Sequence, residues 1–305
     1  MRIYTHTACL EHDPGIGHPE SPARLRAVMQ ALDEPRFASI ERIEAPSATR
    51  EQLERAHGTE YVDHIFASAP SHGLAQLDPD TVMSPGSLEA ALRAAGAACA
   101  ATDAVLARET RRTFCAVRPP GHHATRHEAM GFCLFNSVAV AAAHALGAHR
   151  LDRVAIVDFD VHHGNGTQAI FRHDPRVLYA SSHQMPLYPG TGAASEHGAG
   201  NIFNAPLPPG AGSGEFRAVW EEKLLPELEL FRPQLVLISA GFDADARDPL
   251  AQLQLAPDDY AWITQRLVEL ARRYADGRVV SALEGGYDLD ALREGVAAHV
   301  AALMA

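Results

Sequence analysis

The segment VAIVDFDVHHGNG, residues 154–166, decides the expected fold. Its apolar, β-branched residues are typical of a strand that is buried on both faces of a parallel sheet. On an extended strand, Asp158, Asp160 and His162 all point to one face. An exposed edge strand could also alternate in this way, but the apolar flanks disfavour it. Burying two carboxylates and an imidazole together is unfavourable unless they are paired or bind a cation. The segment therefore predicts a strand that ends in a chemical site.

Similar apolar runs recur along the chain and alternate with amphipathic segments. Strands are expected over residues 2–6, 113–117, 154–161, 176–181, 234–241 and 278–283, and helices over 21–32, 87–107, 133–147, 166–174, 257–275 and 289–304. This alternation favours parallel strands joined by crossover helices. We therefore expect one α/β domain over residues 1–305, with a central, mostly parallel sheet flanked by helices on both faces.

Composition and charge narrow the class of protein. Of 305 residues, 47% are apolar, which is enough for a large core. The net charge of −12 disfavours nucleic acid and anionic membranes as partners and favours a cationic substrate. The four cysteines lack C-x-x-C spacing, the first residues lack a signal-peptide core, and no apolar run approaches the roughly 20 residues of a membrane span. We expect a cytoplasmic protein with reduced thiols and no membrane partner.

Polar residues gather where the expected strands end. In an open parallel sheet, ligands bind beyond the carboxyl ends of the strands. Here the strands run into RPPGHH (118–123), DFDVHHGNG (158–166), SSH (181–183), SAGFDAD (239–245) and LEGGY (283–287). Four of these five tails carry His, Asp or Tyr beside glycine, and packing in a core gives no reason for that preference. The convergence predicts a catalytic site at this edge of the sheet.

These residue types indicate metal-assisted hydrolysis. One carboxylate and one imidazole from residues 154–166 fit a zinc ligand set, and another carboxylate would complete three protein ligands and leave a position for water. That carboxylate is Asp243 or Asp245, which periodicity alone does not separate. His122 and His123 can transfer protons, and Tyr287 can donate a hydrogen bond to the developing oxyanion.

The motifs resemble the zinc-dependent histone deacetylase family of the arginase/deacetylase superfamily, and look most like its class II members and their bacterial relatives. The matching segments are HPESPARL (18–25), RPPGHHA (118–124), GFCLFN (131–136), DFDVHHGNGTQ (158–168), YPGTG (188–192), SAGFDADARDPL (239–250) and LEGGYDL (283–289). They cover nearly the whole chain in the family's order. The resemblance implies the arginase/deacetylase fold and a zinc amidohydrolase that removes acetyl or other acyl groups from the ε-amine of lysine.

The resemblance also assigns roles at the centre of the site. It implies that Asp160, His162 and Asp243 bind one zinc ion.

The same resemblance divides the two adjacent histidines. His123 would act as general base and then as general acid, while His122 would be an electrostatic partner. Asp158 would orient His122 and Asn165 would orient His123, and the uncharged amide should leave that imidazole less basic than an aspartate would. Tyr287 would polarise the scissile carbonyl.

Further positions follow from the resemblance at the substrate tunnel. Gly131, Phe132 and Tyr188 would form the tunnel walls, with His183 near the rim, and Arg24 would line an internal channel for product exit.

Two other features of the family bear on cofactors and substrates. The carbonyls around residues 158–162, with Ser181 and Ser182, resemble a structural potassium site. Where one polyamine-specific branch carries a gatekeeping glutamate, this chain has Leu250, which weakens a polyamine interpretation.

Several hypotheses stay open on the sequence. The leading one is deacylation of a protein, a peptide or a lysine-like amine, and the alternative with the same chemistry is an acetylpolyamine deacetylase. A two-metal manganese ureohydrolase is disfavoured because DFDVHHGNG lacks the D-A-H-x-D pattern. A non-catalytic acyl-binding protein is disfavoured because every catalytic position holds a competent residue. A homo-oligomer is neither indicated nor excluded.

Overall fold

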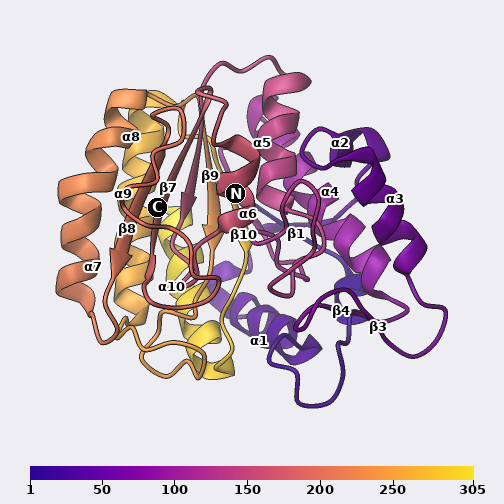
Figure 1. The fold of residues 1–305 in the computed structure, drawn as a ribbon. Helices are drawn as coiled ribbons and strands as arrows, with labels where there is room; N and C mark the ends of the chain where they lie inside the picture. Colours follow the sequence, from indigo (N-terminus) through magenta and orange to yellow (C-terminus); the bar gives the residue numbers. More distant parts are fainter.

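Eight parallel strands form the centre of the protein in a computed structural model that describes residues 1–305 (Figure 1). Their order across the sheet is β2-β1-β5-β10-β9-β6-β7-β8, and every neighbouring pair is parallel. The strands are β1 (Arg2–Thr5), β2 (Glu41–Glu44), β5 (Arg112–Cys115), β6 (Val154–Asp158), β7 (Val177–Gln184), β8 (Ile202–Leu207), β9 (Leu235–Ala240) and β10 (Val279–Leu283).

Helices cover both faces of the sheet (Figure 1). On one face, α4 (Ser87–Leu106) packs against α5 (Ser137–Gly147), with α2 (Arg50–Glu54) beside α5 and α3 (Thr59–Ser68) beside α2. On the other face, α10 (Leu289–Met304) packs between α1 (Pro22–Leu32) and α9 (Pro257–Tyr274), and α8 (Leu225–Phe231) continues this layer. The shorter α6 (Asn165–Phe171) and α7 (Ser213–Val219) follow β6 and β8.

One hydrophobic core joins these layers. Strands β6, β7, β9 and β10 are buried along their whole length, because helices cover them on both sides. A single cluster of 84 buried hydrophobic residues includes side chains of the sheet and of both helix layers, so the fold has one core. The four cysteines are buried and unpaired. None of the helices is long and apolar enough to cross a membrane.

The expected α/β fold is confirmed, with differences at the edges of the sheet. Strands β2 and β8 were not expected. The sequence of β2, ERIE, is mostly exposed because it lies at one edge. Strand β8 contains Pro206, which lacks an N–H donor and is tolerated at the other edge.

A second difference lies in the segment that decides the fold. Strand β6 ends at Asp158, four residues after it begins, so Asp160 and His162 lie in the loop that leads into α6. That loop stays fully buried from Phe159 to Gly164, so the polar side chains remain inside the protein at the carboxyl edge.

A small hairpin covers this edge from outside. Strands β3 (Ala75–Gln76) and β4 (Val82–Met83) pair antiparallel, and Asp78 and Asp80 lie in the turn between them. This turn packs beside the loop that contains Gly131, because the Gly131 N–H donates to Asp80 Oδ1 at 3.1 Å.

Candidate active site

Asp160, His162 and Asp243 meet beyond the carboxyl ends of β6 and β9. Their potential ligand atoms lie within 4.8 Å of one another, and all three residues are buried. His162 Nδ1 lies 3.1 Å from Asp160 Oδ1 and 3.1 Å from Asp243 Oδ2. Two buried carboxylates that face one imidazole form a donor set of oxygen and nitrogen suited to a divalent cation. This arrangement is a metal site.

Backbone amides hold the two carboxylates in place. The Gly285 N–H donates to Asp160 Oδ2 at 2.8 Å, and the Val161 N–H donates to Asp243 Oδ1 at 2.9 Å. A Cβ atom at Gly285 would lie 2.0 Å from Asp243 Oδ2, so only glycine lets this loop approach so closely. The strand-end loops therefore fix one oxygen of each carboxylate and leave the other toward His162.

The structure agrees with the family resemblance in grouping Asp243, and not Asp245, with Asp160 and His162. Asp245 accepts hydrogen bonds from the Arg247 side chain at 2.9 and 3.0 Å, and it is not part of the metal-binding group. Asp243 faces His162. Because the two aspartates are two residues apart on an irregular loop rather than on a strand, their periodicity carried no information about which one points inward.

His122 is paired with a carboxylate. Its Nδ1 lies 3.0 Å from Asp158 Oδ2, which also accepts a hydrogen bond from the Tyr179 hydroxyl at 3.0 Å. Burial alone would lower the pKa of His122, but the charges of Asp160 and Asp158 outweigh it and raise that pKa well above its usual value. A cation bound by Asp160 would offset part of this effect, and Asp158 would remain. The pairing with Asp158 thus favours the charged form of His122.

His123 has a neutral partner instead. Its Nδ1 lies 2.8 Å from Asn165 Oδ1, while the Asn165 amide group donates to Met130 Sδ at 3.2 Å. The proton of His123 therefore resides on Nδ1, and Nε2 keeps a free lone pair. Burial lowers the pKa of His123 well below its usual value, and the nearby imidazoles of His122 and His162 lower it further. The lowered pKa favours the neutral form of this imidazole.

A cavity of about 240 Å³ leads from the surface to His123 and His162. Its lining residues are Asp80, His123, Gly131, Phe132, His162, Leu187, Tyr188, Leu250 and Tyr287. The Phe132 and Tyr287 rings meet edge to face, with centroids 5.9 Å apart, and Tyr188 meets the His123 ring at 5.2 Å. Gly131 has a positive φ of 56°, and a Cβ there would lie 2.4 Å from the His123 ring. Any other residue would displace the imidazole.

Tyr287 is held at the inner part of the cavity by its backbone and by Arg24. The Tyr287 N–H donates to Asp248 Oδ2 at 2.7 Å, and the Arg24 guanidinium lies 4.8 Å from the centre of the phenol ring. Burial raises the pKa of Tyr287 well above its usual value, although Arg24 opposes this. The phenol is therefore neutral and able to donate a hydrogen bond.

Arg24 is buried behind the site rather than exposed on its helix. Its guanidinium donates to the carbonyl oxygens of Gly286 and Glu284 and to Glu20 Oε1 at 3.1 Å. Glu20 also pairs with the buried Arg118. A surface position for Arg24 is thereby excluded.

His183 does not lie near the rim of the cavity, which corrects the expectation. It belongs to the fully buried strand β7, where Nδ1 lies 2.9 Å from Ser181 Oγ and Nε2 lies 2.9 Å from the Gly192 carbonyl oxygen. Its ring packs 4.8 Å from that of His163. Because β7 continues to Gln184, His183 remains within the sheet and supports the loop of Gly192 from behind.

Sequence reasoning missed three residues of the site. Glu284 is buried and accepts hydrogen bonds from the Gly121 and His122 N–H groups at 2.6 and 3.1 Å. Its burial raises its pKa to about 7. It follows strand β10 directly, so the rule about strand ends could have found it. Asp80 and Leu187 also line the cavity, and sequence reasoning assigned no role to either of them.

A second group of potential ligands consists of the buried His144 and the more exposed Asp103 and His149. Arg55 donates to His144 Nδ1 at 2.6 Å, which places the proton of that ring on Nε2, 2.7 Å from Asp103 Oδ1. His149 Nε2 reaches the same oxygen at 2.6 Å. Because Nε2 of His144 has no free lone pair, this group is complete without a metal ion.

Comparisons with known proteins agree with this site. The family described as the histone deacetylase domain matches residues 18–303. The chain is 42% identical to a histone deacetylase-like amidohydrolase of Pseudomonas aeruginosa, over 89% of this chain and 73% of the relative. It is 40% identical to a probable deacetylase of Archaeoglobus fulgidus, over 94% of this chain and 81% of the relative. It is also 39% identical to the human polyamine deacetylase HDAC10, over 98% of this chain and 46% of that protein.

The fold leads to the same family. The crystal structure of the HDA15 HD domain superposes with a TM-score of 0.93 at 36% sequence identity, covering 99% of this chain and 88% of the other. The match includes the parallel sheet whose carboxyl edge carries the buried Asp160, His162 and Asp243. The chain therefore belongs to the histone deacetylase family and is an amidohydrolase of that family.

Proposed function

We propose that the protein is a zinc-dependent deacylase that removes acetyl or other acyl groups from the ε-amine of lysine, in proteins or in lysine-like amines. The observation that carries the proposal is the cavity of about 240 Å³, which has aromatic walls and reaches His162 of the buried group Asp160, His162 and Asp243. A narrow, largely apolar passage suits an alkyl chain whose amide is cleaved at the bottom.

Zinc fits the donor set. Asp160 and Asp243 offer carboxylate oxygens and His162 offers Nδ1, and three such oxygen and nitrogen donors are a ligand set that zinc takes in catalytic sites. A zinc ion held there would supply Lewis-acid polarisation of the scissile carbonyl and activation of the attacking water.

The protein's own residues would divide the proton transfers. His123, neutral and with a free Nε2, would accept the proton of the water, and it would later donate a proton to the amine that leaves. His122, whose Nδ1 pairs with Asp158, would stabilise negative charge that develops on the substrate. The neutral phenol of Tyr287 would donate a hydrogen bond to the oxygen of the scissile carbonyl.

The walls and the rear of the cavity would orient the substrate and the product. Phe132 and Tyr188 would pack against the methylene groups of the lysine stem, next to the Gly131 backbone and Leu250. Buried Arg24, which contacts Tyr287 and Glu20, would lie along the route by which acetate leaves. The structural potassium ion near Ser181 and Ser182 stays a prediction.

A polyamine substrate is the second candidate. A relative of this chain is named a polyamine deacetylase, and the net charge of −12 with Asp80 in the cavity wall favours cationic amines. Leu250 works against it, because an apolar side chain at the cavity wall offers no counter-charge to a second ammonium group.

A side-by-side substrate panel tests the proposal. The zinc-loaded protein would be given an acetyl-lysine peptide, longer acyl-lysine peptides, acetylputrescine and acetylspermidine, and kcat/KM would be measured for each. We expect the acetyl-lysine peptide to give the highest value. A higher value for the acetylpolyamines would support the second candidate, and no turnover of any substrate by protein with intact zinc would refute both.

The variant Leu250→Glu sharpens the choice between the two candidates. A carboxylate at this position would attract a second ammonium group, so we expect kcat/KM for acetylspermidine to rise by about tenfold relative to the acetyl-lysine peptide. The matched control is Leu250→Gln, which has the same shape without the charge. An equal effect of both variants would show that shape rather than charge selects the substrate.

A further inference from the structure

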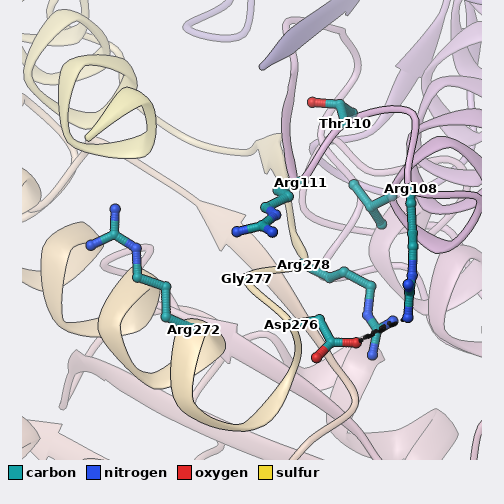
Figure 2. Close-up of a pocket in the computed structure, with 8 residues that line it drawn as sticks. Arg108, Thr110, Arg111, Arg272, Asp276, Gly277 and Arg278 are labelled. Atoms are coloured by element: carbon teal, nitrogen blue, oxygen red, sulfur yellow. Dashed lines mark ion pairs between the residues drawn. The ribbon is translucent and has the colours of Figure 1, made fainter.

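A basic pocket lies at the amino ends of strands β5 and β10, the end of the sheet opposite to the metal site (Figure 2). Four arginines line it. Arg108 and Arg111 belong to the segment between α4 and β5, while Arg272 lies in the last turn of α9 and Arg278 precedes β10. In Figure 2, Arg272 approaches the hollow from α9, and Arg108 and Arg111 approach it from the other side. The volume of the pocket is about 500 Å³.

The positive charge in this pocket exceeds the negative charge. Asp276 is the single carboxylate in the lining, and it lies 3.8 Å from Arg108 and 3.4 Å from Arg278. The Arg111 side chain makes no ion pair and no hydrogen bond, and the Arg272 side chain makes one hydrogen bond, to the backbone oxygen of Ala305. Four guanidinium groups and one carboxylate give the lining a formal charge of +3, in a chain whose net charge is −12.

The excess of positive charge also affects the pKa of the neighbouring Arg112. Burial lowers its pKa, and the like charges of Arg272 and Arg111 lower it further. Glu109, the nearest other acid along the chain, forms an ion pair with Arg2 at the start of β1. The arrangement thus concentrates positive potential in a concave place, where it attracts anions more strongly than on a flat surface.

We propose that this pocket binds a small, multiply charged anion of the phosphate class, such as a compound with two linked phosphoryl groups. Arginine guanidinium groups match phosphate oxygens in geometry and form charge-assisted hydrogen bonds with them. Val105 is the single apolar residue of the lining, so the pocket has no slot for a nucleobase or another apolar moiety. The ligand is therefore recognised by its charges. This inference does not depend on the substrate of the metal site.

The test measures binding by isothermal titration calorimetry at low salt, with pyrophosphate, ADP and inorganic phosphate as probes. We expect pyrophosphate to bind one per chain, ADP to bind with an affinity within about threefold of pyrophosphate, and inorganic phosphate to bind at least about tenfold more weakly, because it engages fewer guanidinium groups. Equal affinities for pyrophosphate and inorganic phosphate, or much tighter binding of ADP, would overturn the assigned ligand class.

Two matched double variants locate the binding. Arg111→Gln with Arg272→Gln should weaken pyrophosphate about a hundredfold, since each lost charged hydrogen-bond donor is worth about tenfold. Arg266→Gln with Arg293→Gln removes the same two charges elsewhere on the surface, where these arginines pair with Glu269 and Asp290. It should leave the affinity nearly unchanged.

A single variant guards against an effect on folding. Arg111→Gln alone removes a side chain that makes no hydrogen bond, so it should keep the melting temperature and still weaken pyrophosphate about tenfold. Equal weakening by the two double variants, or full affinity in Arg111→Gln, would refute the pocket as the binding site.

Discussion

The two ends of the parallel sheet carry opposite arrangements of charge. At the carboxyl end, Asp158, Asp160 and Asp243 are buried, and each is held by imidazoles or backbone N–H groups within about 3 Å. At the amino end, Arg108 is largely exposed and Arg111 has no partner. The same two strands, β5 and β10, connect both ends: their amino ends border the basic pocket, and the loops after them carry His122 and Tyr287.

The comparison shows that the role of a charged side chain depends on whether the side chain is buried. Buried charges must be compensated within the protein, so their positions are fixed to fractions of an ångström and suit bond-making chemistry. Exposed, uncompensated charges keep their side-chain freedom and suit the capture of a soluble ion. Substitutions at the carboxyl end should therefore change the rate of hydrolysis, while substitutions at the amino end should change binding of anions only.

The largest expected effect is the loss of a metal ligand. Asp243→Asn should reduce bound zinc, measured by elemental analysis, and lower kcat by about a thousandfold, because Lewis-acid activation is worth several kcal/mol. The control is Asp245→Asn, two residues away, whose carboxylate pairs with Arg247. Full zinc content and activity in Asp243→Asn would refute the assigned ligand.

A smaller loss of kcat is expected when the phenol hydroxyl of Tyr287 is removed. Tyr287→Phe removes one hydrogen-bond donor to the developing oxyanion, which should lower kcat by about a hundredfold with little change in KM. Zinc content and melting temperature should stay at the values of the unmodified protein. If the variant keeps its full rate, Tyr287 has no part in the chemical step.

The third expected effect, in Asn165→Asp, is a change in the pH dependence of kcat/KM rather than a loss of activity. His123 must be neutral to act as a base, and its lowered pKa keeps it neutral at pH 7. Asn165→Asp places a carboxylate beside Nδ1, which should raise that pKa by about one unit or more. Activity is lost when the imidazole is protonated, so the acid limb of the kcat/KM profile should move to higher pH by the same amount.

The shift of the acid limb in Asn165→Asp tests whether His123 is the general base. An acid limb that stays in place would mean that another group than His123 controls it. Zinc content must be unchanged in Asn165→Asp for the comparison to hold.

The smallest expected effect lies at the amino end of the sheet. Arg111→Gln with Arg272→Gln should leave kcat/KM for an acetyl-lysine peptide within about twofold, because the exposed arginines are separated from the metal site by the length of β10, about 16 Å at about 3.3 Å per residue. A loss of activity comparable to that of Tyr287→Phe would break the distinction between the two ends.

Some features of the protein follow from local sequence. The apolar run at 154–158 specifies a buried parallel strand, and the polar tails after the strands specify where ligands bind, because carboxyl ends of parallel strands share one edge. The helices expected at 21–32, 87–107, 257–275 and 289–304 form within one residue of those limits, since their apolar periodicity matches the face that each helix buries.

Other features depended on contacts between segments that are distant in the chain. Periodicity did not separate Asp243 from Asp245, because a loop decides which carboxylate faces His162; the family resemblance alone had favoured Asp243. The burial of His183 depended on how far β7 extends. Asp80 lines the cavity because the β3–β4 hairpin places it there. Glu20 forms ion pairs with Arg24 and Arg118 because their segments pack together behind β10.

The sequence by itself determined the class of fold, the edge of the sheet at which chemistry occurs, and the residue types of the metal site. Only the tertiary structure decided which oxygen faces the metal site, which tautomer His123 adopts through Asn165, and that Arg111 and Arg272 share one pocket. The physical reason is that hydrophobic periodicity is a local property of the chain, whereas hydrogen-bond direction and electrostatic compensation depend on partners that folding brings together.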